Sequence, residues 1–436
     1  MILHSTTGKY SEVSFAEGIV NGLAPDGGLY MPASYPTLPL ALFRNICEMK
    51  LQDIAYVVYN SLFSDILSSA AIKRIVDEAL NFNIPLTQLD DNKYVLELYH
   101  GPTHSFKDVG ARLMAQLLPE IVPIPQNGKR RIILASSGDS GGAMANAFKD
   151  MPSTSVIILY PKGELTNEQI LQFVTIENVI PIEVNGSYDE CQSLVKAVLQ
   201  ADTEKKCFGL TSGNSINLAR ELPSIIYFFH AYARAIEAHK MKTDVVISIP
   251  CGNLGSLAAA LMAKKMGLPI SRFLAVNNAN DVFVEYLKTG NLVPQKALLT
   301  LARAMDVGNP SNIARIIDLY GGNIAMLRSD VEGYSYNDAE IVGTMRNIYQ
   351  HKGILLDPQG AAAVRAIEKH VAHREVGVAL ACANPTKIGS TIANAIGIES
   401  TQTATVQTSI LASEHRRIIK IPPTIGALHK ILATNT

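Results

Sequence analysis

The sequence predicts an α/β protein with two open, largely parallel sheets flanked by helices, and with a helical extension at its N-terminus. Three observations carry this prediction. Apolar, strand-like runs alternate with helical patterns between residues 131 and 276, which is typical of parallel sheets with helices on both faces. The chain has 436 residues, enough for two or three domains. Hydrophobic residues make up 47% of it and charged residues only 18%, which suits large buried sheets.

Composition and charge exclude several classes of protein. The formal net charge of −1 offers no electrostatic footprint for nucleic acid or an anionic membrane. No apolar stretch reaches the roughly 20 residues of a membrane span, and the N-terminus lacks a signal-peptide pattern. Five scattered cysteines without a CxxC pair argue against disulfides or a metal site, and for a reducing compartment. We therefore expect a cytoplasmic globular enzyme without a metal, and composition leaves both a monomer and a homodimer open.

Residues 1–92 are predicted to form an N-terminal subdomain packed on the larger unit. Residues 51–67 and 72–80 carry apolar side chains at helical spacing. A shorter helical pattern near Phe15 is followed by a loop dense in glycine, residues 22–28. This segment suggests no chemistry of its own, so we assign it to packing.

Residues 93–120 form a lysine segment. A β-prone run (94–99) leads through a Gly-Pro turn to Lys107 and then to an apolar helical pattern, so Lys107 falls where a loop becomes a helix. Unpaired N–H groups and the helix dipole disfavour a cation at such a start, and the pKa of this amine is expected to be low. A neutral amine is what Schiff-base chemistry requires. The alternative is an ordinary solvated lysine.

The rest of the chain is predicted to form a small domain (121–205) and a large cofactor domain (206–436). Short apolar runs in both indicate buried parallel strands, separated by helical patterns. A long helix is predicted over 216–239. The predicted strands cover residues 131–135, 155–160, 178–184, 208–211, 245–250 and 272–276, and a last one begins at 378.

Three polar loops follow predicted strands, at 136–142, 211–217 and 250–256. In open parallel sheets ligands bind beyond the carboxyl ends of the strands, so these loops are expected to converge. The third loop is the clearest phosphate cradle, because Gly252 and Gly255 let the backbone approach an anion at a helix start. The alternative is a plain helix cap.

The other two loops also carry candidate binding groups. In the second, Asn214, Ser215 and Arg220 could grip another anion, although a capped helix with a surface arginine explains them equally. The first matches G-x-S-x-G around Ser140, the context of a hydrolase nucleophile. No HGGG loop accompanies it, and neither His230, His351 nor His415 has a persuasive setting as its partner.

Five separate segments resemble the long form of threonine synthase. They are GLAPDGGLYMP, HGPTHSFKD, SGDSG, AMDVGNPSN and LACANPTK, and the resemblance runs from about residue 5 to 387. It implies the tryptophan synthase β-like fold of pyridoxal-phosphate enzymes (fold type II). It also implies that Lys107 holds pyridoxal 5'-phosphate covalently and is the catalytic base.

The resemblance assigns the remaining site residues as well. Cofactor-binding residues are Gly252, Asn253, Leu254 and Gly255 at the phosphate, Asp139 beside the ring and Cys382 at the pyridine nitrogen. Four residues depart from the family's usual pattern, since Ser140 and Cys382 each replace a threonine and both Gln359 and Asn384 replace histidines. Substrate-binding residues are Ser136, Ser137, Ser140, Asn214, Ser215 and Arg220.

The implied activity is the conversion of O-phosphohomoserine and water to L-threonine and phosphate, the last step of threonine biosynthesis. Lys107 would move protons in a γ-elimination followed by a β-addition. One alternative is a related phospho-lyase that releases 2-oxobutanoate, ammonia and phosphate. Two others are a serine hydrolase using Ser140 and a non-catalytic binding protein.

Overall fold

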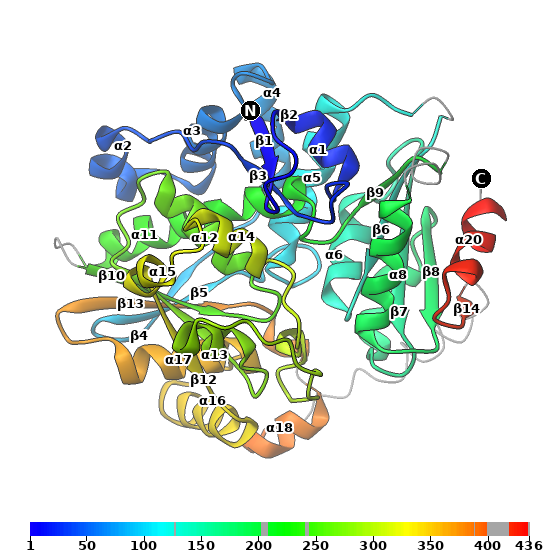
Figure 1. Ribbon diagram of the computed structural model, residues 1–436. Helices are drawn as coiled ribbons and strands as arrows, with labels where there is room; N and C mark the ends of the chain where they lie inside the picture. Colours follow the sequence, from blue (N-terminus) through cyan, green and yellow to red (C-terminus); the bar gives the residue numbers. More distant parts are fainter. Residues whose placement is uncertain (126–127, 202–207, 240–243, 388, 399–417, 435–436) are drawn as a thin grey trace.

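Two main sheets organise the molecule, a computed structural model that describes residues 1–125, 128–201, 208–239, 244–387, 389–398 and 418–434. The larger has six strands in the order β12-β11-β10-β13-β5-β4 and is parallel except at β4. The smaller has five parallel strands in the order β14-β8-β7-β6-β9. Figure 1 shows the two sheets side by side, which confirms the predicted fold class.

The strands of these sheets are apolar runs because both of their faces are covered. All six residues of β6 and all seven of β13 are buried. The larger sheet contains β4 (Leu86–Asp90), β5 (Lys93–Glu97), β10 (Asp244–Pro250), β11 (Arg272–Asn277), β12 (Val331–Ser335) and β13 (Glu375–Ala381). The smaller contains β6 (Arg130–Ala135), β7 (Thr154–Pro161), β8 (Val179–Val184), β9 (Leu210–Ser212) and β14 (Ile419–Ile421).

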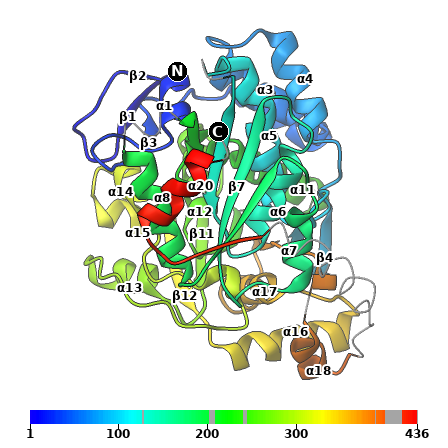
Figure 2. The same cartoon turned by 90° about the vertical axis from the view of Figure 1, so that its right-hand side faces the viewer.

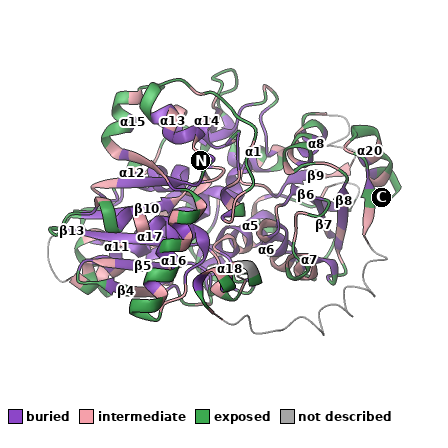
Figure 3. Ribbon diagram, turned by 90° about the horizontal axis from the view of Figure 1, so that it is seen from below, coloured by how far each residue is buried: buried purple, intermediate pink, exposed green. Residues whose placement is uncertain are grey.

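Alternate residues of each strand pack against different helices. In β10, Val245 and Ile247 join the core that contains α11 and α12, whereas Val246 joins the core of α16 and α17. In β6, Ile133 packs on the opposite face from Ile132, in the core formed with α8 and α20. Figure 2 shows α8 and α20 in front of the smaller sheet, and Figure 3 shows buried strands beneath exposed helical surfaces.

The helices of the N-terminal half lie on both sheets. They are α1 (Phe15–Asn21), α2 (Leu40–Asn45), the 3-10 turn η1 (Ile46–Glu48), α3 (Leu51–Phe63), α4 (Ser69–Ala79), α5 (Lys107–Ile121), α6 (Asp139–Ala147), α7 (Asn167–Val174) and α8 (Tyr188–Gln200). A three-stranded antiparallel sheet that the sequence did not predict lies at the N-terminus, formed by β1 (Ile2–Ser5), β2 (Val13–Ser14) and β3 (Tyr30–Pro32).

The long helix predicted over 216–239 is broken in the structure. It is replaced by α10 (Leu218–Glu221), η2 (Leu222–Ile225) and α11 (Ile226–His239). The break contains Pro223, which has no N–H to donate to a helical carbonyl in the preceding turn. The later helices are α12 (Gly255–Lys265), α13 (Val282–Thr289), η3 (Arg303–Met305), α14 (Ile313–Leu319), α15 (Ile324–Asp330), α16 (Asp338–Lys352), α17 (Pro358–His370), η4 (Pro385–Lys387), α18 (Ser390–Ile396) and α20 (Ile425–Thr434).

Three strands lie in a different sheet from the one that the expected domain ranges suggest. β9 and β14 belong to the smaller sheet, although both were expected in the large domain (206–436). β4 belongs to the larger sheet, although it was expected in the N-terminal subdomain (1–92). Strands far apart in sequence pair here, and no local pattern encodes such pairing. We therefore propose to define the two units by their sheets, with the C-terminal strand and α20 returning to the smaller one.

Within the described residues no helix is long and apolar enough to cross a membrane. The same residues contain no cluster of histidine, cysteine, aspartate and glutamate side chains that could hold a metal ion.

Candidate functional site

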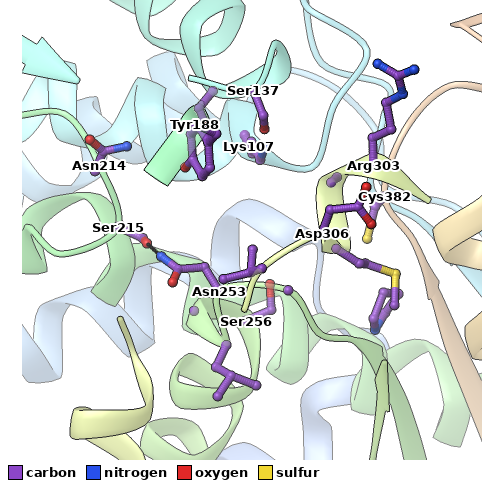
Figure 4. Close-up of a pocket in the computed structure, with 18 of the residues that line it drawn as sticks. Lys107, Ser137, Tyr188, Asn214, Ser215, Asn253, Ser256, Arg303, Asp306 and Cys382 are labelled. Carbon is purple, nitrogen blue, oxygen red and sulfur yellow. Dashed lines mark hydrogen bonds between the residues drawn. The ribbon is translucent and has the colours of Figure 1, made fainter. Parts of the chain in front are cut away.

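A cavity of about 450 Å³ opens where the three polar loops approach Lys107. Its size is in the range of small-molecule and cofactor sites. The predicted residues that line it are Lys107, Ser137, Ser140, Asn214, Ser215, Arg220, Gly252, Asn253, Leu254, Gly255 and Cys382. Figure 4 shows six of them around the cavity, namely Lys107, Ser137, Asn214, Ser215, Asn253 and Cys382.

Lys107 is fixed by contacts between its loop and the end of β13. The Phe106 N–H donates to the Cys382 carbonyl over 2.8 Å, and Ser105 pairs with Ala383 in an isolated β-bridge. The Lys107 amine makes no hydrogen bond or ion pair with a described residue, so it is available to a ligand in the cavity. As expected for the first residue of α5, its pKa is lowered.

The main cause of this lowered pKa differs from the one that the sequence suggested. Burial is the largest contribution, because removing the amine from water disfavours its charged form. The negative charge of Asp139 opposes this effect, and the positive charges of Arg220 and Lys387 add to it. The Lys107 amine therefore loses its proton at a lower pH than a lysine on the surface would.

Asp139 does not line the cavity but lies behind it in an ion pair with Lys387. The two side-chain atoms, Oδ1 and Nζ, are 3.2 Å apart. Burial is the largest single influence and opposes ionisation of this carboxyl, but the positive charges of Lys387 and Lys107 and the hydrogen bonds from Lys387 and Gln169 together outweigh it and lower the pKa. Because Lys387 follows β13 and Asp139 begins α6, the pair ties the two sheets together beside Lys107.

Ser136 was predicted to bind the substrate, but its side chain does not line the cavity. Its hydroxyl oxygen accepts hydrogen bonds from the N–H groups of Gly138 at 3.0 Å and Gly141 at 2.7 Å, and it donates to the Gly138 carbonyl at 3.1 Å. The side chain is fully buried and turns under its own loop instead of into the cavity. It supports the φ of 124° at Gly138, a conformation that favours glycine.

Replacing Ser136 with alanine should therefore reduce stability. The substitution leaves two buried N–H groups without an acceptor, and we expect the free energy of unfolding to fall by about 1–3 kcal/mol. Urea unfolding would measure this. The matched control is Ser140→Ala, four residues along the same loop, whose side chain lines the cavity and whose loss should change stability far less. Equal losses in both variants would contradict the supporting role of Ser136.

The loop after β10 has the properties of a phosphate cradle. Leu254 adopts a left-handed conformation (φ 60°) and precedes α12 without a side-chain cap, so N–H groups at the helix start face the cavity. A Cβ on Gly252 would lie 2.6 Å from the Ala304 carbonyl oxygen, so only glycine fits there. Asn253 contributes through its backbone, because its side chain donates to Ser215 (3.2 Å, Figure 4) and accepts from the Ser311 N–H (2.6 Å).

These features fit the phosphate of pyridoxal phosphate. The cradle presents backbone donors and a helix N-terminus to an anion, and Lys107 supplies an amine in the same cavity for the cofactor's aldehyde. Cys382 lies in the cavity wall, and burial raises the pKa of its thiol, so the group stays neutral. A neutral thiol is a weak partner for a pyridine nitrogen and does not protonate it.

Arg220 is a buried cation without a hydrogen-bond or ion-pair partner among the described side chains. Its side chain is 7% exposed, and its guanidinium lies over α5, where a Cβ on Gly110 would meet Nη1. It forms no ion pair or side-chain hydrogen bond with a described residue, and it lines the cavity. Burial lowers its pKa, but an arginine remains charged at any ordinary pH. A buried, unpaired guanidinium of this kind calls for an anionic ligand.

Ser215 and Asn214 differ in what they can offer beside Arg220. The Ser215 hydroxyl accepts from the amides of Asn253 (3.2 Å) and Asn312 (3.0 Å), which leaves its own hydrogen free for a ligand. The Asn214 amide is bound at both ends to the backbone of Ala135, at 3.0 and 2.8 Å. Asn214 therefore aligns the second loop with β6 and retains one N–H at most for a ligand.

The cavity also contains residues that the sequence analysis did not select. Arg303 donates to the Glu164 carbonyl over 2.9 Å and so connects η3 with the segment after β7. The segment AMDVGNPSN (304–312) follows Arg303 directly, and no local pattern in it indicates which of its side chains face a ligand. The unselected lining residues with polar side chains include Glu164, Ser187, Tyr188, Asp189, Glu221, Ser224, Lys296, Arg303 and Asp306.

The hydrolase alternative finds no support in this geometry. No histidine is present among the described residues that line the cavity. His230 is buried elsewhere, hydrogen-bonded to the Ile84 carbonyl (2.8 Å), and burial lowers its pKa to about 4. His351 bonds to the Asn347 carbonyl of its own helix, and His415 lies outside the described residues. Ser140 thus has no general base of the expected kind.

Comparisons with known proteins agree with the site. A family model described as pyridoxal-phosphate dependent enzyme matches residues 82–383, and one described as threonine synthase N terminus matches residues 3–80. The threonine synthase of Haemophilus influenzae is 36% identical over 400 residues, 92% of each chain. The crystal structure of threonine synthase from Escherichia coli superposes with a TM-score of 0.91 at 31% identity, covering 100% of both chains. A pyridoxal-phosphate-bound threonine synthase from Brucella melitensis gives 0.87 at 28% identity, covering 100% of this chain and 99% of that one.

Proposed function

The chain belongs to the threonine synthase family of pyridoxal-phosphate-dependent enzymes, and from this premise we propose that its cavity converts O-phosphohomoserine and water to L-threonine and phosphate. It is a lyase of threonine biosynthesis. One observation carries the proposal furthest. Lys107, an amine whose pKa is lowered, lines the same cavity as two separate anion sites. These are the backbone cradle at 252–255 and the guanidinium of Arg220. A phosphorylated cofactor and a phosphorylated substrate together require two such sites.

Six residues would hold the cofactor in this proposal. Lys107 would bind its aldehyde carbon, and the N–H groups of Gly252, Asn253, Leu254 and Gly255 would bind its phosphate. Cys382 would face the ring nitrogen as a neutral thiol. When bound, pyridoxal phosphate withdraws electrons from the substrate carbons next to the amino group and so makes their protons acidic.

Lys107 moves the protons of the reaction. Its burial favours the neutral form, which accepts one proton at a time. It can take the proton from the substrate Cα, pass it to water in the cavity so that the amine is neutral again, and then take one from Cβ. The water gives its proton back to Cα when the product forms. The ion pair of Asp139 with Lys387 keeps a compensated charge behind the amine, so the site does not hold Lys107 as a permanent cation. The same amine can then return a proton to Cγ after the phosphate has left.

Arg220 and Ser215 bind the leaving group. The bond between Cγ and the phosphate oxygen breaks, and the guanidinium stabilises the negative charge that grows on that oxygen. The free hydroxyl hydrogen of Ser215 donates to a second oxygen of the phosphate. Ser137 and Ser140 reach the cavity from the first loop and can donate to the same group. Water then adds its oxygen at Cβ, which gives threonine.

A product assay tests the proposed function. The purified protein, loaded with pyridoxal phosphate, should form threonine and phosphate in equal amounts from O-phosphohomoserine. In ¹⁸O-labelled water the label should appear in the threonine hydroxyl and not in the phosphate, because water attacks carbon. Formation of 2-oxobutanoate and ammonia would identify the phospho-lyase instead. Homoserine with labelled phosphate would identify a simple phosphate-ester hydrolase, and either result would overturn the proposal.

A further inference from the structure

Glu221 is a buried carboxyl at the phosphate cradle. It is the last residue of α10, its side chain is 4% exposed, and it lines the cavity. Its oxygens lie against the first residue of α12, since a Cβ on Gly255 would be 2.7 Å from Oε2 and 2.9 Å from Oε1. The carboxyl therefore reaches the helix start that we assign to the cofactor phosphate.

This carboxyl has no partner in the described part of the chain. It forms no ion pair or side-chain hydrogen bond there, although Arg220 is its neighbour in sequence. The guanidinium of Arg315 is committed to the carbonyls of Ser215 (2.5 Å) and Ile216 (2.7 Å) and to the Asn312 amide oxygen. The carboxyl opens onto the cavity, where a proton or a hydrogen-bond donor on a ligand would lower the cost of its burial.

A bound phosphate makes the ionised form of Glu221 costly. A phosphate monoester carries close to two negative charges above about pH 6. The cradle itself, residues 252–256, contains no basic side chain to offset an added carboxylate. A protonated carboxyl would remove the repulsion and supply an O–H donor in its place.

We propose that Glu221 is a cofactor-binding residue that shares one proton with the phosphate held at residues 252–255. The proposal rests on the assignment of pyridoxal phosphate to this cavity and goes beyond it. The carboxyl donates its O–H to a phosphate oxygen, and this proton replaces the cation that many phosphate sites use. Cofactor binding at neutral pH therefore takes up a proton.

The charges around Glu221 agree with this role. Burial raises its pKa to about 7, and the positive charges of Arg315 and Arg220 only partly oppose the effect. On α5, which packs against α10, Lys107 and Asp108 are the ionisable groups that act on the adjacent Arg220. The helix α14 contributes Arg315, and its Asp318 bonds His4. Glu17 on α1 is exposed, and both η2 and the start of α12 are uncharged.

The sign of the pH dependence follows from this arrangement. Phosphate raises the pKa of Glu221 above its value of about 7 in the free protein. The shared proton then contributes fully to the affinity for the phosphate below pH 7. This contribution is lost as the pH rises towards the pKa of Glu221 in the bound state. Affinity should fall by up to about tenfold per pH unit across this window.

The test compares two cofactor forms on the apoprotein. Dissociation constants of pyridoxal phosphate and pyridoxal are measured between about pH 7 and 9, and their ratio is taken, so that the titration of Lys107 cancels. For the unmodified protein, the factor by which pyridoxal phosphate binds more tightly than pyridoxal should fall with rising pH. In Glu221→Gln, which keeps a donor but cannot titrate, this factor should not change with pH and should exceed that of the unmodified protein at high pH. Glu164→Gln, the same change on another wall of the cavity, should retain the slope.

A second readout separates a shared proton from a structural effect. The ³¹P resonance of bound pyridoxal phosphate should titrate in the unmodified protein and lose this titration in Glu221→Gln. An unchanged slope and an unchanged ³¹P titration in Glu221→Gln would overturn the proposal, and so would a carboxyl that stays ionised with phosphate bound. Neither measurement depends on threonine formation, so a failed product assay would leave this inference standing. A protein that does not bind pyridoxal phosphate at all would overturn both.

Discussion

Replacing Lys107 with alanine should abolish covalent cofactor binding and reduce turnover by about 10³-fold or more. The variant lacks both the amine that attaches the cofactor and the group that moves the substrate protons, and acid–base groups alone contribute about 10²–10⁴-fold. The visible absorbance of lysine-bound pyridoxal phosphate should disappear with it. Spectroscopy of the purified variant and the threonine assay measure the two losses independently.

Lys296 provides the matched control for this experiment. It lines the same cavity but is exposed, in the segment before η3. Lys296→Ala should retain the absorbance of the bound cofactor. If Lys107→Ala kept the band and full activity, or if Lys296→Ala lost the band, the assignment of the attachment site would fail.

Arg220→Ala should raise the KM for the phosphorylated substrate by about 10²-fold or more while covalent cofactor binding persists. Hydrogen bonds to charged groups contribute about 1.5–3 kcal/mol each, and a guanidinium can form two with one phosphate. Because Arg220 has no described ion-pair partner, its removal leaves no orphaned carboxylate in a salt bridge. Steady-state kinetics with O-phosphohomoserine measures the change.

Arg220→Lys distinguishes charge from geometry. The variant keeps a cation near the phosphate but loses the planar fork, so its KM should lie between those of the unmodified protein and Arg220→Ala. Cofactor affinity is measured in parallel by absorbance titration. Equal losses of cofactor and substrate affinity in Arg220→Ala would show that this arginine serves the cofactor phosphate instead.

Three of the four residues that depart from the expected family pattern line the cavity, and the fourth lies close to the Lys107 segment. The three are Ser140, Cys382 and Gln359, and Asn384 lies in the loop that pairs with the Lys107 segment through the His104 carbonyl (3.0 Å). Asn384 also accepts from the N–H and hydroxyl of Thr386, at 2.9 and 2.8 Å, so it shapes the turn before Lys387. The replacements at residues 359, 382 and 384 therefore act on the ring end of the proposed cofactor site and leave both anion sites intact.

Local patterns were sufficient for much of the fold. One of the helical patterns predicted between the strands is α8, because Ser187 caps it and its apolar residues have helical spacing. Strand–helix alternation likewise predicted the parallel sheets. The break at Pro223 was missed although its signal was present in the sequence, and the antiparallel sheet at the N-terminus was missed because its strands are very short.

By itself, the sequence determined the fold class, the position of Lys107 at a helix start and the three loops that follow buried strands. Hydrophobic periodicity, glycine and proline act over a few residues, so these features can be recognised without knowing the fold. Only the tertiary structure decided that β14 returns to the smaller sheet, that Ser136 turns under its loop, and that Glu221 meets Gly255. Each of these depends on which distant segments pack together and on which way a side chain points once they do. A carboxyl becomes a candidate proton donor only when folding buries it beside a phosphate cradle, more than thirty residues away in sequence.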